Sequence, residues 1–323
     1  MSRLAFIFPG QGAQFVGMGK ELAEAFPSAR AVFEEVDDVL GDRLSRLIWE
    51  GPEEVLRLTS NTQPALMAVS VAVMRALEKE FGIYVERAQY VAGHSLGEYS
   101  ALCSAGAIGL ADTARLLRTR GEAMQAAVAP GVGAMAALLG ADPDQAKAAC
   151  VAGMDAAGGT CEIANDNAPG QIVLSGAKAA IEAACEHAKA NGVKKAVPLS
   201  VSAPFHCSLM APAAEKMKEA LADTHIMTPR VPLLANVTAK PTSDADLIRS
   251  QLVEQVTGQV RWRESVTAMF ESGVTEMVEA GAGKVLTVMN RRTVRELKGT
   301  TLGTPSELEA FAATINETEE TTA

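Results

Sequence analysis

The segment Gly-His-Ser-Leu-Gly-Glu-Tyr at residues 93–99 constrains the fold of this chain more than any other feature of its sequence. It follows a short run predicted as a strand, residues 89–92, and leads into a helix-forming run, residues 98–105. Glycines on both sides of a serine allow a sharp strand-to-helix turn that holds the hydroxyl at the carboxyl end of a sheet. The first N–H groups of the helix lack intrahelical partners and can stabilise an oxyanion. The pattern favours Ser95 as a nucleophile, and the alternative is a chance match in a Gly- and Ser-containing loop.

The same order of elements recurs elsewhere in the chain. Residues 4–8 form an apolar run typical of a buried strand, residues 9–12 form a Pro-Gly-Gln-Gly turn, and residues 18–26 have helical spacing. Strand, loop and helix follow one another again around Ser95 and at residues 274–288. This recurrence predicts a parallel sheet covered by helices, and therefore an α/β body.

A different order, β-α-β-β-α-β, is predicted between residues 131 and 199, and it is the ferredoxin-like order. We therefore expect a large α/β subdomain formed by residues 1–130 and 200–315, with a small ferredoxin-like subdomain inserted at 131–199. Residues 316–323 are acidic and Thr-rich, which predicts a flexible tail. The strands predicted in the insert are residues 134–139, 162–165, 171–175 and 195–199, and the helices are residues 142–152 and 177–190.

The composition is that of a soluble globular protein, since 323 residues with 48% hydrophobic and 21% charged residues can bury a large core. The formal net charge of −10 repels polyanions, so nucleic-acid binding is not expected. The N-terminal apolar run is too short for a signal peptide, and no apolar run reaches the about 18 residues of a membrane span. We expect a cytoplasmic protein without a membrane segment. The five cysteines are scattered and form no Cys-x-x-Cys pair, so neither a disulfide framework nor a metal site is predicted.

A serine nucleophile needs a base, and the chain has four histidines. His187 and His225 lie in polar surroundings and are expected to face solvent, while the side chain of His94 should leave the turn in a different direction from Ser95. His206 remains, in a loop that follows the predicted insert. Its imidazole could take the proton of Ser95 and return it to a departing group. The alternative is a loop histidine without a chemical role.

Five segments in this order resemble the malonyl-CoA:acyl carrier protein transacylase family, an acyltransferase family. The resemblance extends from residue 4 to about residue 290. Each motif is weak evidence alone, but the ordered set is specific. The segments are Phe-Pro-Gly-Gln-Gly-Ala-Gln at 8–14, Gly-His-Ser-Leu-Gly-Glu-Tyr-Ser at 93–100, Arg120-Gly121 before Met124-Gln125, Asn-Ala-Pro-Gly-Gln at 167–171, and Pro-Phe-His at 204–206.

The resemblance implies a hydrolase-like α/β body with a ferredoxin-like insert, and a role for each matching residue. Ser95 matches the acylated serine, and His206 matches its partner, which a main-chain carbonyl in the region of Gln255 orients in place of an Asp. The backbone N–H groups of Gln11 and Leu96 match the oxyanion hole. Further matches are Arg120 for the arginine that holds the malonyl carboxylate, and Phe205 for the position before the histidine, where many bacterial members have Ser.

The implied activity is transfer of a malonyl group from malonyl-CoA to the phosphopantetheine thiol of acyl carrier protein, in a ping-pong cycle through malonyl-Ser95 that feeds fatty acid synthesis. This thioester chemistry needs no metal or redox cofactor. The expected partners are acyl carrier protein and a coenzyme A thioester. Nothing in the sequence demands more than a monomer.

Two residues would set the acyl choice in this activity. A planar guanidinium at Arg120 pairs both oxygens of a carboxylate, so an acetyl group would leave it desolvated and unpaired. Without the resemblance, Arg120 would be read as an exposed cation on the helical run 112–128. A bulky ring at Phe205 would exclude an α-methyl branch and favour malonyl over methylmalonyl.

Two other functions use parts of the same pattern. An α/β-hydrolase esterase or thioesterase would keep the Ser95 turn but needs an acid between Ser and His, for example Asp155 or Asp166. Both candidates fall inside the predicted insert. A scaffold that binds acyl carrier protein with a decayed site is the non-enzymatic alternative, and the presence of both Ser95 and His206 disfavours it.

Overall fold

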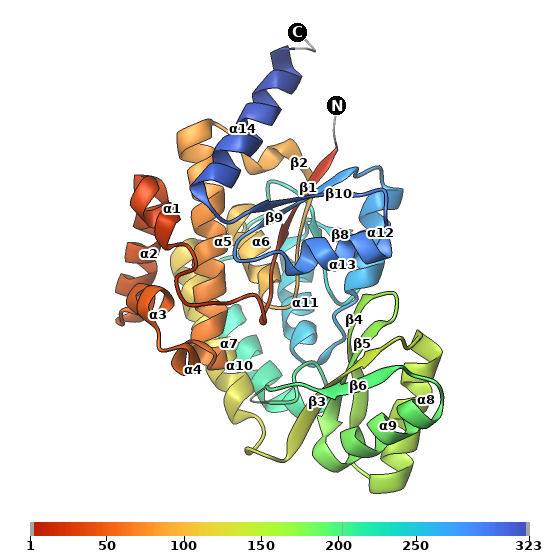
Figure 1. Cartoon of the computed structure of the whole chain (residues 1–323). Helices are drawn as coiled ribbons and strands as arrows, with labels where there is room; N and C mark the ends of the chain where they lie inside the picture. The colour runs from red at the N-terminus through yellow and green to blue at the C-terminus, as the bar shows by residue number, and fades with distance from the viewer. Residues whose placement is uncertain (1–2, 202, 321–323) are drawn as a thin grey trace.

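The computed structural model describes residues 3–201 and 203–320, and it contains two separate β-sheets, each with its own helices. In Figure 1 the larger sheet occupies the upper part of the molecule, and the smaller sheet lies at the lower right. The predicted α/β class is confirmed at this level, with one largely parallel sheet and one antiparallel sheet. No helix in the described ranges combines the length and apolar character needed to cross a membrane.

The larger sheet has six strands in the order β10-β9-β1-β2-β7-β8. All neighbours pair in parallel except β7 and β8 at one edge. Phe8 pairs with Gly93 at the carboxyl ends of the two central strands, so the loops that follow these strands lie side by side. The strands are β1 (Leu4–Phe8), β2 (Ala88–Gly93), β7 (Leu233–Leu234), β8 (Pro241–Thr242), β9 (Glu276–Ala280) and β10 (Lys298–Leu302).

Alternate residues of β1 enter different cores, because successive side chains of a strand point to opposite faces. Phe6 and Phe8 pack with the helices of one face, and Ala5 and Ile7 pack with those of the other. The helices of the large body are α1 (Lys20–Ala25), α2 (Pro27–Leu40), α3 (Leu44–Glu50), α4 (Glu53–Leu56), α5 (Thr59–Phe81), α6 (Gly97–Ser104), α7 (Leu110–Ala126), α10 (Ala211–Ala222), α11 (Ala245–Thr257), α12 (Trp262–Glu271), α13 (Val285–Thr293) and α14 (Pro305–Glu320), with short 3₁₀ turns η1 (Val85–Arg87) and η2 (Ser208–Met210).

The smaller sheet is antiparallel, with the strand order β4-β5-β3-β6. Two helices, α8 and α9, pack against each other and share with the sheet a hydrophobic core of their own. The elements follow the predicted order β-α-β-β-α-β. They are β3 (Gly133–Leu139), α8 (Pro143–Ala157), β4 (Cys161–Ala168), β5 (Gln171–Ala177), α9 (Lys178–Ala190) and β6 (Lys195–Pro198).

Strand β4 joins the smaller sheet to the large body. The N–H of Asp166 donates to the carbonyl of Val260 (3.0 Å), and the N–H of Val260 donates to the carbonyl of Ala164 (2.8 Å). The guanidinium of Arg263 forms three hydrogen bonds of 2.7–3.0 Å with the buried carboxylate of Asp166. These contacts hold β4 close to the carboxyl ends of the central strands, so the smaller sheet forms one wall of the cavity described below.

The end of the chain departs from the expectation of a flexible tail from residue 316. Helix α14 continues to Glu320, and residues 321–323 lie outside the described ranges. Leu308 and Phe311 of this helix are buried in the large core, and Ile315 packs against it. Because this apolar side anchors most of its length, the polar end extends a helix that is already formed.

Candidate active site

A strained turn holds Ser95 between β2 and α6. Its φ of 53° lies in the left-handed region, which non-glycine residues seldom adopt. A Cβ at Gly93 would lie 1.9 Å from the carbonyl of Gly97, and a Cβ at Gly97 would lie 2.3 Å from the carbonyl oxygen of Phe8. Each of these two positions therefore accepts only glycine. The absence of a Cβ at Gly97 lets the start of α6 lie against the end of β1. The strand, turn and helix predicted around Ser95 are confirmed.

The structure brings His206 to Ser95, although 111 residues separate them in the chain. The Nε2 atom of His206 lies 2.7 Å from the Oγ of Ser95. Its Nδ1 lies 2.8 Å from the main-chain carbonyl of Gln255 and 3.1 Å from that of Gly258. Carbonyls only accept, so Nδ1 carries the proton and Nε2 is free to accept the hydroxyl proton of Ser95.

Burial and, next, the positive charge of Arg120 lower the pKa of His206 to about 3. The two carbonyl contacts act in the opposite direction, because they stabilise the imidazolium. The imidazole is therefore neutral at pH 7, as a general base must be.

The acid that a hydrolase triad would require does not reach His206. No carboxylate in the described ranges hydrogen-bonds to its ring. Asp166 is buried and binds Arg263, while Asp155 is exposed on α8. Neither aspartate weighed for the esterase or thioesterase alternative can orient the imidazole.

The other histidines are arranged differently. The Nε2 of His94 lies 2.8 Å from the side-chain oxygen of Asn167, so its ring turns away from the Ser95 hydroxyl as expected, although it lines the same cavity. His225 is exposed, whereas His187 is half-buried on α9 and does not face solvent freely.

Arg120 is buried beside Ser95, with an exposed fraction of 1%, so its interpretation as an exposed helix cation is wrong. Its Nη1 donates to Gln63 (2.7 Å), and its Nη2 donates to the side-chain oxygen of Gln255 (2.9 Å) and to the Oγ of Ser95 (3.2 Å). Its Nε has no hydrogen-bond partner among the described residues. Burial lowers the pKa of Arg120. The hydrogen-bond acceptors of this buried guanidinium in the described ranges are neutral groups, so it is suited to receive an anionic group of a ligand.

The backbone amides of Gln11 and Leu96 lie on the two loops that β1 and β2 bring together. Gln11 follows β1, and Leu96 is the N-cap residue of α6. Neither N–H has an acceptor among the described residues, and both residues line the cavity that contains the Oγ of Ser95.

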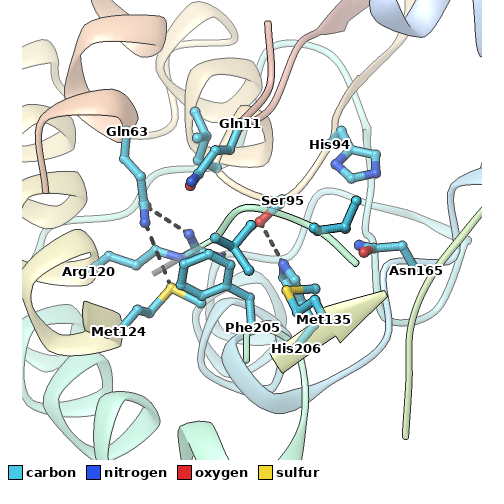
Figure 2. A pocket seen from close by; sticks show the side chains of 13 residues that line it. Gln11, Gln63, His94, Ser95, Arg120, Met124, Met135, Asn165, Phe205 and His206 are labelled. Carbon is cyan, nitrogen blue, oxygen red and sulfur yellow. Dashed lines mark hydrogen bonds between the residues drawn. The ribbon is translucent and has the colours of Figure 1, made fainter. Parts of the chain in front are cut away.

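Gln11, Ser95, Leu96, Arg120 and His206 line one cavity that is open to solvent. Figure 2 shows Ser95, His206 and Arg120 converging on it, with the ring of Phe205 beside them. Phe205 is buried at 7% exposure and forms part of the wall. Apolar side chains in the rest of the lining come from α7, from β3 of the smaller sheet and from the segment after β6, and they are Met124, Met135, Leu199 and Val201.

Asn236, Gln63 and Glu98 belong to the site but were not predicted from the sequence. The side-chain oxygen of Asn236 accepts the N–H of Ser95 (2.8 Å), and its amide donates to the carbonyl of Gly93 (2.7 Å). Asn236 follows β7, which pairs with β2 in parallel, so it lies at the carboxyl edge of the larger sheet. This position could have indicated a site residue, because ligands bind at that edge. That strand has only two residues and gives no pattern in the sequence.

No group of three or more His, Cys, Asp or Glu side chains arranged to hold a metal ion occurs in the described ranges. All five cysteines are free thiols.

Comparison with known proteins gives the family directly. The acyl transferase domain family matches residues 5–319. Malonyl CoA-acyl carrier protein transacylase of Bacillus subtilis is 46% identical over 317 residues, covering 98% of both chains.

Solved structures agree with this assignment. The crystal structure of acyl-carrier-protein-S-malonyltransferase from Bartonella henselae superposes with a TM-score of 0.94 at 54% identity, covering 97% of this chain and 99% of that one. A malonyl-transacylase in complex with its type II PKS acyl-carrier protein superposes with a TM-score of 0.91 at 42% identity, covering 95% and 98%. The resemblance drawn from five sequence motifs is confirmed, and the chain belongs to the malonyl CoA-acyl carrier protein transacylase family of acyl transferases.

Proposed function

We propose that this protein transfers a malonyl group from malonyl-CoA to the phosphopantetheine thiol of acyl carrier protein, through a malonyl ester of Ser95. One observation carries the proposal: the Oγ of Ser95 lies 2.7 Å from a neutral imidazole and 3.2 Å from a buried guanidinium within one open cavity. The first group activates a nucleophile, and the second binds a carboxylate. Malonyl thioesters carry both an electrophilic carbonyl and a free carboxylate.

In the first half-reaction, His206 takes the hydroxyl proton while the Oγ of Ser95 attacks the thioester carbonyl. The N–H groups of Gln11 and Leu96 stabilise the oxyanion of the tetrahedral intermediate. The carbon–sulfur bond then breaks, and the imidazolium returns its proton to the departing coenzyme A thiolate. The products are free coenzyme A and malonyl-Ser95.

In the second half-reaction, the phosphopantetheine thiol gives its proton to His206, and its sulfur attacks the ester carbonyl. The bond from Ser95 Oγ to the carbonyl carbon breaks, and the imidazolium protonates the serine oxygen. The same groups thus serve both directions of a ping-pong cycle. These steps need only malonyl-CoA, which is a thioester, and the phosphopantetheine thiol of the carrier.

The acyl choice follows from the groups around the acyl chain. Arg120 would bind the malonyl carboxylate, and an acetyl group would leave this buried cation unpaired. Phe205 would fill the space that an α-methyl branch requires.

The remaining parts of the assignment rest on the fold and the relatives. We propose a hydrolase-like body from residues 1–130 and 200–315 and a ferredoxin-like subdomain at residues 131–199, which agree with the two cores and the strand order of the smaller sheet. The carrier-bound relative supports acyl carrier protein as the partner. We further propose a monomeric cytoplasmic protein that supplies malonyl groups to fatty acid synthesis, without nucleic-acid or membrane partners.

Intact-protein mass spectrometry after brief mixing with malonyl-CoA tests this function. We expect a malonyl adduct on the wild-type chain, none on Ser95→Ala, and an undiminished adduct on Ser100→Ala, which replaces a buried serine on α6, the helix that follows Ser95. Addition of a phosphopantetheinylated carrier should discharge the adduct onto its thiol. Rapid release of free malonate without an acceptor thiol would contradict transfer and support hydrolysis.

A further inference from the structure

A buried carboxyl group, Glu98, lies behind the proposed active site and has no part in the reaction steps above. It belongs to the first turn of α6 and has an exposed fraction of 1%. Burial raises the pKa of Glu98 to about 7, whereas hydrogen bonds and the charge of Arg120 act to lower it. Because a buried carboxyl group is costly to retain, its contacts indicate what it does.

One oxygen of Glu98 accepts two hydrogen bonds from different segments. The Oε2 atom accepts the backbone N–H of Asn236 (3.0 Å) and the side-chain Nε2 of Gln255 (3.0 Å). Its Oε1 has no partner in the described part of the chain. Glu98 therefore links α6 to the segment after β7 and to α11.

The bond to Gln255 determines which way that side-chain amide faces. The Nε2 of Gln255 donates to Glu98 and to the carbonyl of Ser95 (3.0 Å), while its Oε1 accepts from Arg120 (2.9 Å). The Oε2 of Glu98 already accepts the N–H of Asn236 and a guanidinium can only donate, so the amide fits with its Nε2 toward Glu98 and its Oε1 toward Arg120. The carbonyl of the same residue accepts from His206. Gln255 thus contacts the base through its backbone and the cation through its side chain.

The bond to Asn236 supports the nucleophile itself. The Asn236 side chain holds the N–H of Ser95 and the carbonyl of Gly93, the two ends of the strained turn. Its backbone N–H is held by Glu98. Through two neighbours, one carboxyl group reaches the nucleophile, the base and the carboxylate-binding cation.

We propose that Glu98 is a positioning residue for acyl transfer: as a hydrogen-bond acceptor it fixes Gln255 and Asn236, and through them the orientation of His206, Arg120 and the Ser95 turn. The choice of malonyl-CoA as the substrate rests on the function proposed above. The labelling test described next does not depend on that function. Glu98 does not touch the substrate and is not a catalytic residue.

Two substitutions of similar size distinguish the effect of the acceptor oxygen from the effect of the side-chain volume. Glu98→Gln keeps an acceptor oxygen at the same reach, whereas Glu98→Met fills the volume without one. A neutral fluorophosphonate probe that labels Ser95 reports the serine and histidine geometry without any malonyl group. We expect Glu98→Met to slow labelling and to lower kcat/KM for malonyl-CoA by about 10- to 100-fold, and Glu98→Gln to stay within about threefold of wild type.

Glu279 supplies a matched control. It is fully buried on β9, and its carboxylate also accepts two hydrogen bonds, here from the backbone N–H groups of Leu286 (3.0 Å) and Thr287 (2.7 Å). Glu279→Met should lower the melting temperature yet leave labelling and kcat/KM unchanged well below it. If Glu98→Met likewise lowers the melting temperature but leaves labelling and kcat/KM unchanged, the role of Glu98 is purely structural and the proposal is overturned.

A double-mutant cycle tests the route through Gln255. Gln255→Ala keeps the main-chain carbonyl but removes the amide, so Glu98→Met should cost much less in that background than in the wild type. Full additivity would overturn the proposal. If Glu98→Met does not fold, Gln255→Ala alone must show slowed labelling and weaker malonyl-CoA use, and wild-type rates would overturn it. Failure of malonyl transfer in the wild type would contradict the proposed function and leave the probe result valid.

Discussion

The guanidinium of Arg120 lies 3.2 Å from the hydroxyl of Ser95, so the proposed nucleophile and a buried cation share one corner of the cavity. A thioester carbonyl at Ser95 therefore places a carboxylate two carbons away within reach of the cation. In the proposed function, this arrangement would join recognition of the acyl group to its transfer, because both would depend on the same approach to Ser95.

Arg120→Ala should lower kcat/KM for malonyl-CoA by roughly 10²- to 10³-fold, since the substrate carboxylate would enter a buried site without its counter-charge. The rate with acetyl-CoA should fall much less. Arg118 on the same helix binds Asp42 and Asn61 near the surface, so Arg118→Ala is the matched control and should retain activity. Steady-state kinetics with both thioesters check this, and an equal loss for the two would refute the assigned role.

Acylation should persist at mildly acidic pH because the pKa of His206 is about 3. A base whose pKa is lowered stays neutral until the pH falls through that lowered value, so the acid limb of kcat/KM should lie far below 6.5. The measurement is best made in Glu98→Gln, where the carboxyl with a pKa of about 7 is absent. Single-turnover acylation from pH 5 to 8 that shows a midpoint near 6.5 would contradict the prediction.

Part of this architecture could be predicted from the sequence because its patterns are local. The strand at residues 4–8, the turn at Ser95 and the βαββαβ order of the insert all produce short-range periodicity or glycine signals, and all are found in the structure. Helix α5 escaped prediction because nearly every side of it is buried, so its residues show no contrast between an apolar and a polar face. Strand β7 is too short to give any pattern.

Part of the candidate site could also be predicted from the sequence. The glycine spacing indicated Ser95, and elimination among four histidines left His206. Gln255 and Arg120 were predicted from the resemblance to a family, because no local pattern in the sequence marks either residue. Asn236 and Glu98 could not be found, because their contacts join segments 138 and 141 residues apart, which only the packed sheet brings together.

The raised pKa of Glu98 predicts a stability difference between the wild type and Glu98→Gln. An acid whose pKa is raised on folding, here from 4.5 to about 7, binds its proton more tightly in the folded state. Its stabilising contribution is thus complete below 4.5 and is lost as the pH rises through about 7, by on the order of 3 kcal/mol. Arg120 on α7 and Tyr99 on α6 face this carboxyl group, and neither changes charge in that window.

Urea unfolding at pH 5 and pH 8 measures this difference. The free energy of unfolding of the wild type should fall relative to that of Glu98→Gln as the pH rises, and the contribution of His206 cancels because both proteins contain it. Parallel pH dependence in the two proteins would show that Glu98 keeps its ordinary pKa.

Gly93→Ala should destabilise the fold severely, because the new Cβ would meet the backbone of Gly97 at 1.9 Å and cannot be relieved by a side-chain rotation. We expect a loss of more than about 3 kcal/mol, or no folded protein. Gly109→Ala is the matched control, since its φ of −64° suits alanine and a Cβ there meets nothing within 4 Å. Thermal unfolding of the two variants should diverge, and equal melting temperatures would contradict the tight turn.

Replacement of Phe205 should relax the choice of acyl group at the α-carbon. The ring is buried in the cavity wall with Ser95 and Arg120, so Phe205→Ser would open space beside the acyl carbon without touching either group. We expect the ratio of kcat/KM for methylmalonyl-CoA to that for malonyl-CoA to rise about 10- to 100-fold, the range associated with one methyl group in a fitted pocket. The ratio is measured within one variant, so any loss of folded protein cancels. A ratio that stays at the wild-type value would place the selectivity for unbranched acyl groups in another part of the wall.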